Sequence, residues 1–200
     1  MASNMYVICE GGGFYIVDPS VTPDRVPEGV LADDACLKAI LITHCHYDHI
    51  AAVEEWLRRW PEAPVFLSRK DRPFLNDPDA NCSSFISGDR IYSIGTVDFD
   101  KVKELPESFT ISLIETPGHT PGSVSFLVRD RNSGEKALLS GDFLFRGSIG
   151  RTDFPGGSYE QMMDSLERIM DLPDDLPVLP GHGPDSTIGF EKRSNPYFIY

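Results

Sequence analysis

The chain has 200 residues, which is enough for one large domain or two very small ones. Its formal net charge of −13 argues against a nucleic-acid partner, because such a partner needs a basic surface that neutralises phosphates. No apolar stretch approaches the roughly 20 residues that span a bilayer, and the first residues lack the pattern of a secretory signal, so no membrane partner is expected.

The four cysteines, Cys9, Cys36, Cys45 and Cys82, are scattered along the chain and form no C-x-x-C pair. A disulfide scaffold is not expected at this length and composition, so we interpret them as reduced thiols. Together with the absence of a signal pattern, this predicts a soluble cytoplasmic protein.

In the first half of the chain, short apolar runs predict strands at 6–9, 14–17, 37–42 and 65–67. The glycines from Gly11 to Gly13 predict a turn between the first two strands. Residues 50–60 predict a helix that Pro61 ends. Segment 71–87 is rich in Pro, Asn, Asp and Ser, which predicts a short helix and an irregular loop.

In the second half, strands are predicted at 109–115, 124–128, 137–139 and 177–180. Ser158 and Gln161 form a capping box, which predicts the start of a helix. Its apolar stripe predicts core packing for Tyr159, Met162, Met163, Leu166, Ile169 and Met170. A last helix is predicted from near Thr187 to the Asn195-Pro196 pair. The chain shows no linker, so residues 1–200 are predicted to form a single domain.

All five histidines lie in polar loop segments beside turn-forming residues. Three of them fall within seven residues, and the other two each follow a Pro-Gly pair; they are His44, His46, His49, His119 and His182. Imidazole is the commonest protein ligand for transition metals. Asp48 and Asp142 add two carboxylates, and seven such groups exceed the four ligands of a tetrahedral zinc ion. The set therefore indicates two metals.

The positions of these residues also fit a shared site. Each follows an apolar strand segment, which predicts that loops from different strands converge at one edge of a layered structure. His44 and His46 are two residues apart, so in an extended segment their side chains point the same way, and that of Cys45 points away from them. Taken singly, His119 could be structural, Asp142 a turn residue and Asp48 a helix N-cap, but the complete set favours a metal site.

Thr43-His44-x-His46-x-Asp48-His49 resembles the T-H-x-H-x-D-H signature of the metallo-β-lactamase superfamily. The segments 117–123, Gly141-Asp142 and 181–183 resemble its remaining ligand segments in the same order. The resemblance covers nearly the whole chain and implies an α+β fold, an αββα sandwich of two similar halves. It assigns His44, His46 and His119 to a first metal, Asp48, His49 and His182 to a second, and a bridging position to Asp142. Asp48 and Asp142 are the catalytic candidates.

Within this superfamily, segments 141–153 and 191–196 are similar to short bacterial proteins of the glyoxalase II (hydroxyacylglutathione hydrolase) type. This resemblance implies a metal-dependent hydrolase of a thioester such as S-lactoylglutathione, with two divalent metal ions. Zinc is expected, and iron and manganese are the alternatives. True β-lactamases commonly place Cys or Ser where Asp142 stands. Long glyoxalase II enzymes carry a C-terminal helical domain with glutathione contacts, and this chain ends too early to include one.

Four cationic residues, Arg146, Arg151, Lys192 and Arg193, are candidates for binding the carboxylates of a glutathione-like substrate. A negatively charged ligand needs local positive charge on so acidic a chain. The alternative for Arg151 is a buried ion pair with Asp153 or Asp18. For Lys192 and Arg193 the alternative is a solvated helix face, since surface charges usually contribute little.

A second function is implied by similarity to the persulfide dioxygenases of the same superfamily, around Arg146-Gly147 and segment 150–154. These enzymes use one iron, whose ligands would be His44, His119 and Asp142 here, the facial arrangement typical of non-haem iron. A nuclease is disfavoured by the acidic balance and by the large additional domains that nucleases of the superfamily carry. A metal-binding protein without catalysis would not be expected to keep all seven ligands. The oligomeric state is left open by the sequence.

Overall fold

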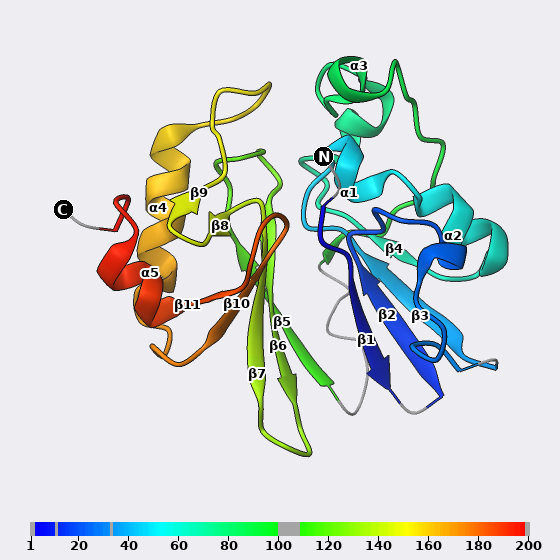
Figure 1. Cartoon of the computed structure of the whole chain (residues 1–200). Helices are drawn as coiled ribbons and strands as arrows, with labels where there is room; N and C mark the ends of the chain where they lie inside the picture. The colour runs from blue at the N-terminus through cyan, green and yellow to red at the C-terminus, as the bar shows by residue number, and fades with distance from the viewer. Residues whose placement is uncertain (1–2, 11, 33, 100–108, 199–200) are drawn as a thin grey trace. The chain divides into compact units, whose positions relative to one another are not determined.

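The structure is a computed structural model that describes residues 3–10, 12–32, 34–99 and 109–198. Gly11, which belongs to the first predicted turn, lies outside the described residues. The chain divides into two compact units, Met1–Lys101 and Val102–Tyr200. Each unit contains its own sheet with helices packed on it (Figure 1).

The first unit is built on a four-stranded sheet in the order β1-β2-β3-β4. Its strands are β1 (Tyr6–Glu10), β2 (Gly13–Val17), β3 (Cys36–Leu41) and β4 (Val65–Phe66). β1 and β2 form an antiparallel hairpin, whereas β3 runs parallel to both β2 and β4. All five residues of β2 are buried, as expected for a strand that is covered on both faces.

The helices of the first unit are short. They are the 3-10 helices η1 (Pro23–Arg25) and η2 (Arg72–Asn76) and the α-helices α1 (Tyr47–Ile50), α2 (Val53–Arg59) and α3 (Ser83–Ile86). α2 packs on the sheet through Val53 and Trp56, which share a core cluster with Phe14, Ile16 and Ile40. The Trp56 indole stacks on that of Trp60 with ring centroids 5.4 Å apart.

Two predictions for this unit need correction. The single helix expected at 50–60 is two helices, because Ala52 leaves helical geometry (φ −109°, ψ 11°) and its N–H donates to the Pro19 carbonyl instead. His49 therefore lies in α1 and not in a loop. Segment 71–87 contains two short helices, η2 and α3, where one was expected.

The second unit is built on a five-stranded sheet in the order β11-β10-β7-β6-β5. Its strands are β5 (Phe109–Glu115), β6 (Val124–Asp130), β7 (Lys136–Gly141), β10 (Pro177–Pro180) and β11 (Ser186–Thr187). β5, β6 and β7 form an antiparallel meander, and β10 returns parallel to β7. A separate hairpin of β8 (Leu144–Phe145) and β9 (Ser148–Ile149) follows β7.

Two helices, α4 (Tyr159–Ile169) and α5 (Ile188–Ser194), complete the second unit. Both start where the sequence predicts, since the Ser158 hydroxyl accepts from Gln161 N–H and the Thr187 hydroxyl accepts from Phe190 N–H. Met162, Leu166 and Ile169 of α4 are buried on the sheet. Tyr159 and Met170 are 53% and 42% exposed, so the predicted core stripe is narrower than expected.

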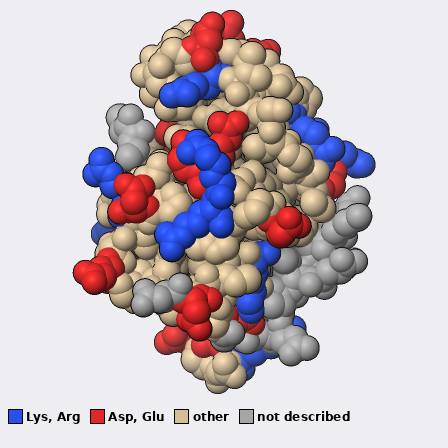
Figure 2. All heavy atoms as spheres, turned by 90° about the vertical axis from the view of Figure 1, so that its right-hand side faces the viewer, with Lys and Arg blue, Asp and Glu red and all other residues tan. Residues whose placement is uncertain are grey.

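Among the described residues, no helix is long and apolar enough to cross a membrane. On the face drawn in Figure 2, lysine and arginine side chains lie among aspartate and glutamate side chains. An anionic polymer approaching this face would meet charges of both signs.

Candidate metal centre

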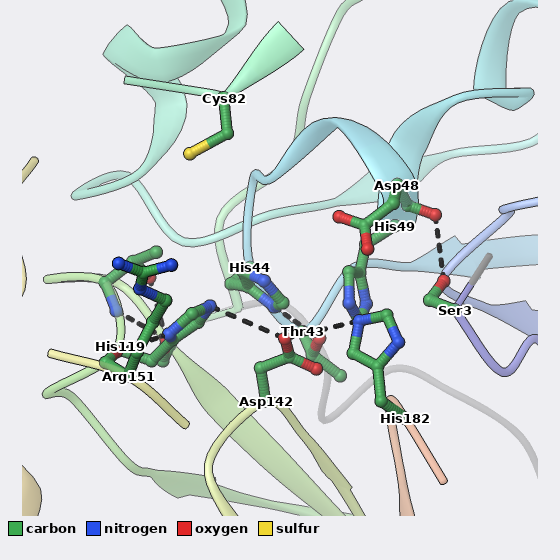
Figure 3. Close-up of polar contacts among 12 residues, drawn as sticks. Ser3, Thr43, His44, Asp48, His49, Cys82, His119, Asp142, Arg151 and His182 are labelled. Atoms are coloured by element: carbon green, nitrogen blue, oxygen red, sulfur yellow. Dashed lines mark hydrogen bonds and ion pairs between the residues drawn. The ribbon is translucent and has the colours of Figure 1, made fainter. Parts of the chain in front are cut away.

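The first group of candidate ligands lies where β3 ends in the first unit. His44, His46 and His49 are 1%, 3% and 0% exposed, and Asp48 precedes His49 in α1. The ligand atoms of His44 and His46 lie within 4.8 Å of one another, as do those of His44 and His49, and those of Asp48 and His49. The structure therefore brings these four predicted residues together. Figure 3 shows His44, Asp48 and His49 of this group.

Asp18 orients His49 in this group. The carboxylate is 2% exposed and accepts hydrogen bonds of 2.7 Å from both the N–H and the hydroxyl of Thr43. Its Oδ2 lies 2.8 Å from Nδ1 of His49. With Nδ1 held by a carboxylate, Nε2 is the nitrogen that this ring presents to a metal, the usual arrangement around a metal-bound histidine.

This role of Asp18 was not predicted from the sequence, where the residue was considered only as a possible partner of Arg151. A usable signal exists, because Asp18 directly follows β2, and β2 runs parallel to β3. Parallel neighbours end at the same sheet edge, so the residue after β2 and the histidine loop after β3 leave the sheet side by side. The left-handed backbone of Asp18 (φ 54°) is a further mark of a specialised position.

Backbone contacts fix the histidine loop. Asp71, which is fully buried, accepts from Cys45 N–H at 3.1 Å, and the Asn81 carbonyl accepts from Tyr47 N–H at 2.7 Å. The Cys45 side chain lies in the hydrophobic core, as its position between two ligands predicts. Burial, together with the nearby Asp71 carboxylate, raises the pKa of the Cys45 thiol well above its usual value. Cys45 is thus a core residue beside the candidate ligands.

The second group lies in the second unit and is centred on Asp142, which directly follows β7. Its Oδ2 is 3.6 Å from Nε2 of His119 and 3.4 Å from Nε2 of His182. Ligand atoms bound about 2.0–2.2 Å from one tetrahedral ion lie roughly 3.3–3.6 Å apart, so these spacings suit shared metal ligation better than a direct hydrogen bond. Asp142 contacts both histidines, as a bridging residue would.

The His119 turn is held by its neighbours. The Arg151 carbonyl lies 2.7 Å from Nδ1 of His119, which leaves Nε2 on the side of Asp142. Gly118 has a φ of 142°, and a Cβ there would lie 2.5 Å from the Met162 Cα, so only glycine allows the turn to approach α4 this closely. The buried Ser165 hydroxyl donates to the Pro117 carbonyl at 2.7 Å.

The donor types in each of the two groups suit metal ligation. Nδ1 is engaged by Thr43 in His44, at 3.1 Å, by Asp18 in His49 and by the Arg151 carbonyl in His119. Buried imidazoles with fixed tautomers and adjacent carboxylates are the ligand chemistry of zinc, iron and manganese sites. The geometry is compatible with the predicted ligand set, and metal ligation by its members stays a prediction. They are His44, His46, Asp48, His49, His119, Asp142 and His182.

Arg151 forms the ion pair with Asp153 that the sequence offered as an alternative to substrate binding. Its guanidinium forms two hydrogen bonds of 2.7 Å with Asp153 and lies over the Phe154 ring at 3.8 Å. The side chains of this ion pair are 55% and 68% exposed, so the pair is not buried as expected. The hydrogen bond from Arg151 is the main cause that lowers the pKa of Asp153.

The other three cationic candidates also have partners within their unit. Arg146 donates to the Asp185 carbonyl at 3.1 Å and lies 4.7 Å from the Phe190 ring. Lys192 and Arg193 both reach Asp174, at 2.9 Å and 3.4 Å, and lower its pKa. Substrate binding by the four cationic residues stays a prediction, and a bound substrate would compete with these contacts. The four are Arg146, Arg151, Lys192 and Arg193.

The sequence profile described as the metallo-beta-lactamase superfamily matches residues 1–182. The chain belongs to this superfamily. The probable metallo-hydrolase YqgX of Bacillus subtilis is 33% identical over 199 residues, which cover 98% of this chain and 92% of YqgX. The hydroxyacylglutathione hydrolase GloC of Haemophilus influenzae is 32% identical and covers 91% of this chain and 85% of GloC.

Solved structures confirm the metallo-β-lactamase fold. The B3 metallo-beta-lactamase BLEG-1 superposes with a TM-score of 0.81 at 33% identity, covering 99% of this chain and 95% of that one. The di-iron-bound form of TTHA1623 gives 0.79 at 32% identity, with 98% and 94% covered. ETHE1 from Myxococcus xanthus gives 0.70 at 29% identity, with 99% and 84% covered. Membership in this superfamily supports a metal-dependent enzyme.

Proposed function

We propose that this member of the metallo-β-lactamase superfamily is a dinuclear metal-dependent hydrolase that cleaves thioesters such as S-lactoylglutathione. His44, His46 and His119 would hold one metal, Asp48, His49 and His182 the other, and Asp142 would belong to both. The proposal draws on the relative GloC, which is named a hydroxyacylglutathione hydrolase. It also draws on the seven-ligand set.

The observation that carries the proposal is the orientation of the two histidine rings assigned to the second metal. His49 is fully buried, and its Nδ1 is held at 2.8 Å by a buried carboxylate. His182 directs Nε2 toward Asp142 at 3.4 Å. In an enzyme with one metal at His44, His119 and Asp142, neither of these two rings would be a metal ligand. Their arrangement therefore favours two metals over one.

The expected chemistry suits a thioester. Two bound divalent ions would lower the pKa of water and polarise the acyl carbonyl. The protein residues would hold the ions and fix their distance from each other through Asp142. A thiolate leaving group has a pKa of about 8.5, so it needs little protonation on departure. This matches the chain, in which all five histidines belong to the two candidate ligand groups.

The alternative is a persulfide dioxygenase with a single iron. The similarity to ETHE1 fits this function, and the di-iron-bound form of TTHA1623 shows iron in another relative. The same three ligands serve both chemistries, so the ligand types do not separate them.

A paired assay on one protein sample separates these functions. Protein purified without added metal is analysed for metal and then given S-lactoylglutathione, with release of thiol as the signal. The same sample is given glutathione persulfide, with oxygen uptake as the signal, and a β-lactam because of the similarity to BLEG-1. We expect thiol release only. Oxygen uptake without thiol release would establish the dioxygenase instead.

Glutathione recognition needs a separate test, because Lys192 and Arg193 already contact Asp174. If they bind glutathione carboxylates, the double variant Lys192→Ala/Arg193→Ala raises KM for a glutathione thioester and leaves a small uncharged thioester unaffected. Equal effects on both substrates, or none on either, would remove these residues from substrate recognition.

A further inference from the structure

Glu191 is a fully buried carboxylate that has no place in the ligand set proposed above. It lies in α5 and accepts three hydrogen bonds, from the β8–β9 hairpin, from β11 and from the C-cap residue of α5 itself. Its Oε2 accepts from Gly147 N–H at 2.9 Å and from the Asn195 amide at 2.8 Å. Its Oε1 accepts from the Ser186 hydroxyl. Burying an ionised group is costly, so a site with three donors indicates that its position matters.

One of these segments is the β8–β9 hairpin. Glu191 holds its turn at Gly147, and Asn195, also fully buried, donates to the Ser148 carbonyl at 3.0 Å. Arg146 adds a hydrogen bond to the Asp185 carbonyl at 3.1 Å. Gly147 has a φ of 73°, which glycine adopts without strain. One buried carboxylate and its amide neighbour thus supply polar contacts between the hairpin and α5, in addition to the apolar packing of Leu144 and Ile149 with Ile188.

Both ends of this hairpin position candidate metal ligands. It starts two residues after Asp142 and ends two residues before Arg151, whose carbonyl orients His119. At Gly150 the returning chain passes so close to Asp142 that a Cβ would lie 1.7 Å from the Asp142 carbonyl oxygen. A shift of the hairpin would therefore move the Asp142 backbone and the Arg151 carbonyl together.

The third segment follows His182. Ser186, which donates to Glu191, lies four residues after His182, and Gly181 N–H donates to the Gly141 carbonyl at 2.8 Å. Glu191 is thus linked to the chain that follows Asp142, to the chain that precedes Arg151, and to the chain that follows His182.

We infer that Glu191 is a positioning residue for metal binding: through the β8–β9 hairpin and β11 it sets the arrangement of His119, Asp142 and His182. The inference rests on the proposed metal site. It predicts that the metal affinity, and not only the folding stability, depends on this carboxylate.

The test measures Zn²⁺ affinity of metal-free protein by competition with a chromophoric chelator, alongside the melting temperature of the same metal-free samples. Glu191→Ala removes an acceptor from the partly buried Gly147 N–H and from the buried Asn195 amide, and we expect a loss of about tenfold or more in affinity for at least one ion. Glu191→Gln should stay within about threefold of wild type, because its oxygen can serve both donors and its NH₂ can donate to Ser186.

Ile169→Ala is the matched control, since it removes buried apolar volume from the same unit without touching these contacts. It should lower the melting temperature and leave Zn²⁺ affinity unchanged. If Glu191→Ala does not fold, Asn195→Ala carries the test, with an expected affinity loss of about threefold or more.

The outcomes are distinct. If wild type binds no Zn²⁺, the proposed function fails first. If wild type binds Zn²⁺ and Glu191→Ala binds it equally, or if Ile169→Ala loses as much affinity, Glu191 has a purely structural role and the inference is overturned.

Discussion

At the scale of single residues, the orientation of the candidate histidine ligands depends on the group that contacts the ring nitrogen facing away from the metal. Three imidazoles have Nδ1 engaged by a hydroxyl, a carboxylate or a carbonyl. The residue types could be predicted from the sequence, because His, Asp and their spacing are visible there. The contact of Asp71 with the histidine loop could not, since this ordinary carboxylate lies 26 residues from Cys45, whose N–H it accepts. Asp18 was missed, although its position directly after the predicted strand 14–17 offered a signal.

The role of Asp18 is tested by Asp18→Asn. Asparagine tolerates the left-handed backbone of this position, so the change removes the carboxylate charge and not the conformation. The amide can present an N–H to Nδ1 of His49 and favour the wrong tautomer. We expect affinity for one of the two metals to fall by about 10–100-fold, as measured by chelator competition.

Asp130→Asn, which changes a partly exposed carboxylate at the end of β6, is the control for Asp18→Asn and should bind metal like wild type. Unchanged affinity in Asp18→Asn would mean that this carboxylate serves only the loop backbone.

Cysteine reactivity tests the burial of the thiols. Cys9 and Cys36 are exposed, whereas Cys45 and Cys82 are buried. Because the thiolate is the reactive form, the raised pKa of Cys45 adds to its protection at neutral pH. Intact-mass measurement after iodoacetamide treatment should show labelling of Cys9 and Cys36 in native protein, and of all four cysteines in denaturant. Rapid native labelling of Cys45 would contradict its place in the core.

At the scale of elements, long periodic segments could be predicted, and short or strongly contact-dependent ones could not. β5 and β10 have the bounds expected from their apolar patterns, and the starts of α4 and α5 could be predicted at Ser158 and near Thr187. The β8–β9 hairpin and β11 consist of two-residue strands, which are too short to show a period. They exist because distant groups such as Glu191 satisfy their backbone and side chains.

Gly150→Ala tests whether the chain after the hairpin fixes Asp142. A methyl group would meet the Asp142 carbonyl oxygen at 1.7 Å, so the backbone of the ligand must move. We expect weakened metal binding, by about tenfold or more, and lower stability. Gly95→Ala, where a Cβ meets nothing within 4 Å, is the control. Wild-type metal affinity in Gly150→Ala would show that the Asp142 position tolerates this shift.

At the scale of the whole molecule, membership in the superfamily tells us the fold and the type of site. It does not identify the substrate. The profile match over residues 1–182 agrees with the signature from Thr43 to His49. The substrate, unlike the fold, could not be predicted from the ligand set, because one ligand set supports several chemistries. The four cationic candidates illustrate the difference, since each has a partner inside its own unit.

Acid should remove metal and activity together. Imidazole binds metal only in its neutral form, so protons compete with the metal as the pH falls toward and below about 6. Bound metal, measured after desalting at each pH, should fall in the same range as thioester hydrolysis. Activity that stayed constant down to about pH 4 would contradict histidine ligation.

The most direct test of the central claim is the metal-to-chain ratio of the wild type and of Asp142→Ala, by elemental analysis of protein purified without chelators. Asp142 contacts both His119 and His182, so its removal should weaken both ions while the chain stays folded. The account predicts about two divalent ions per wild-type chain, and clearly less metal with at least about 100-fold lower thioester turnover in Asp142→Ala. A wild-type chain that holds a single iron, or an Asp142→Ala variant that keeps two ions and near-normal turnover, would contradict it.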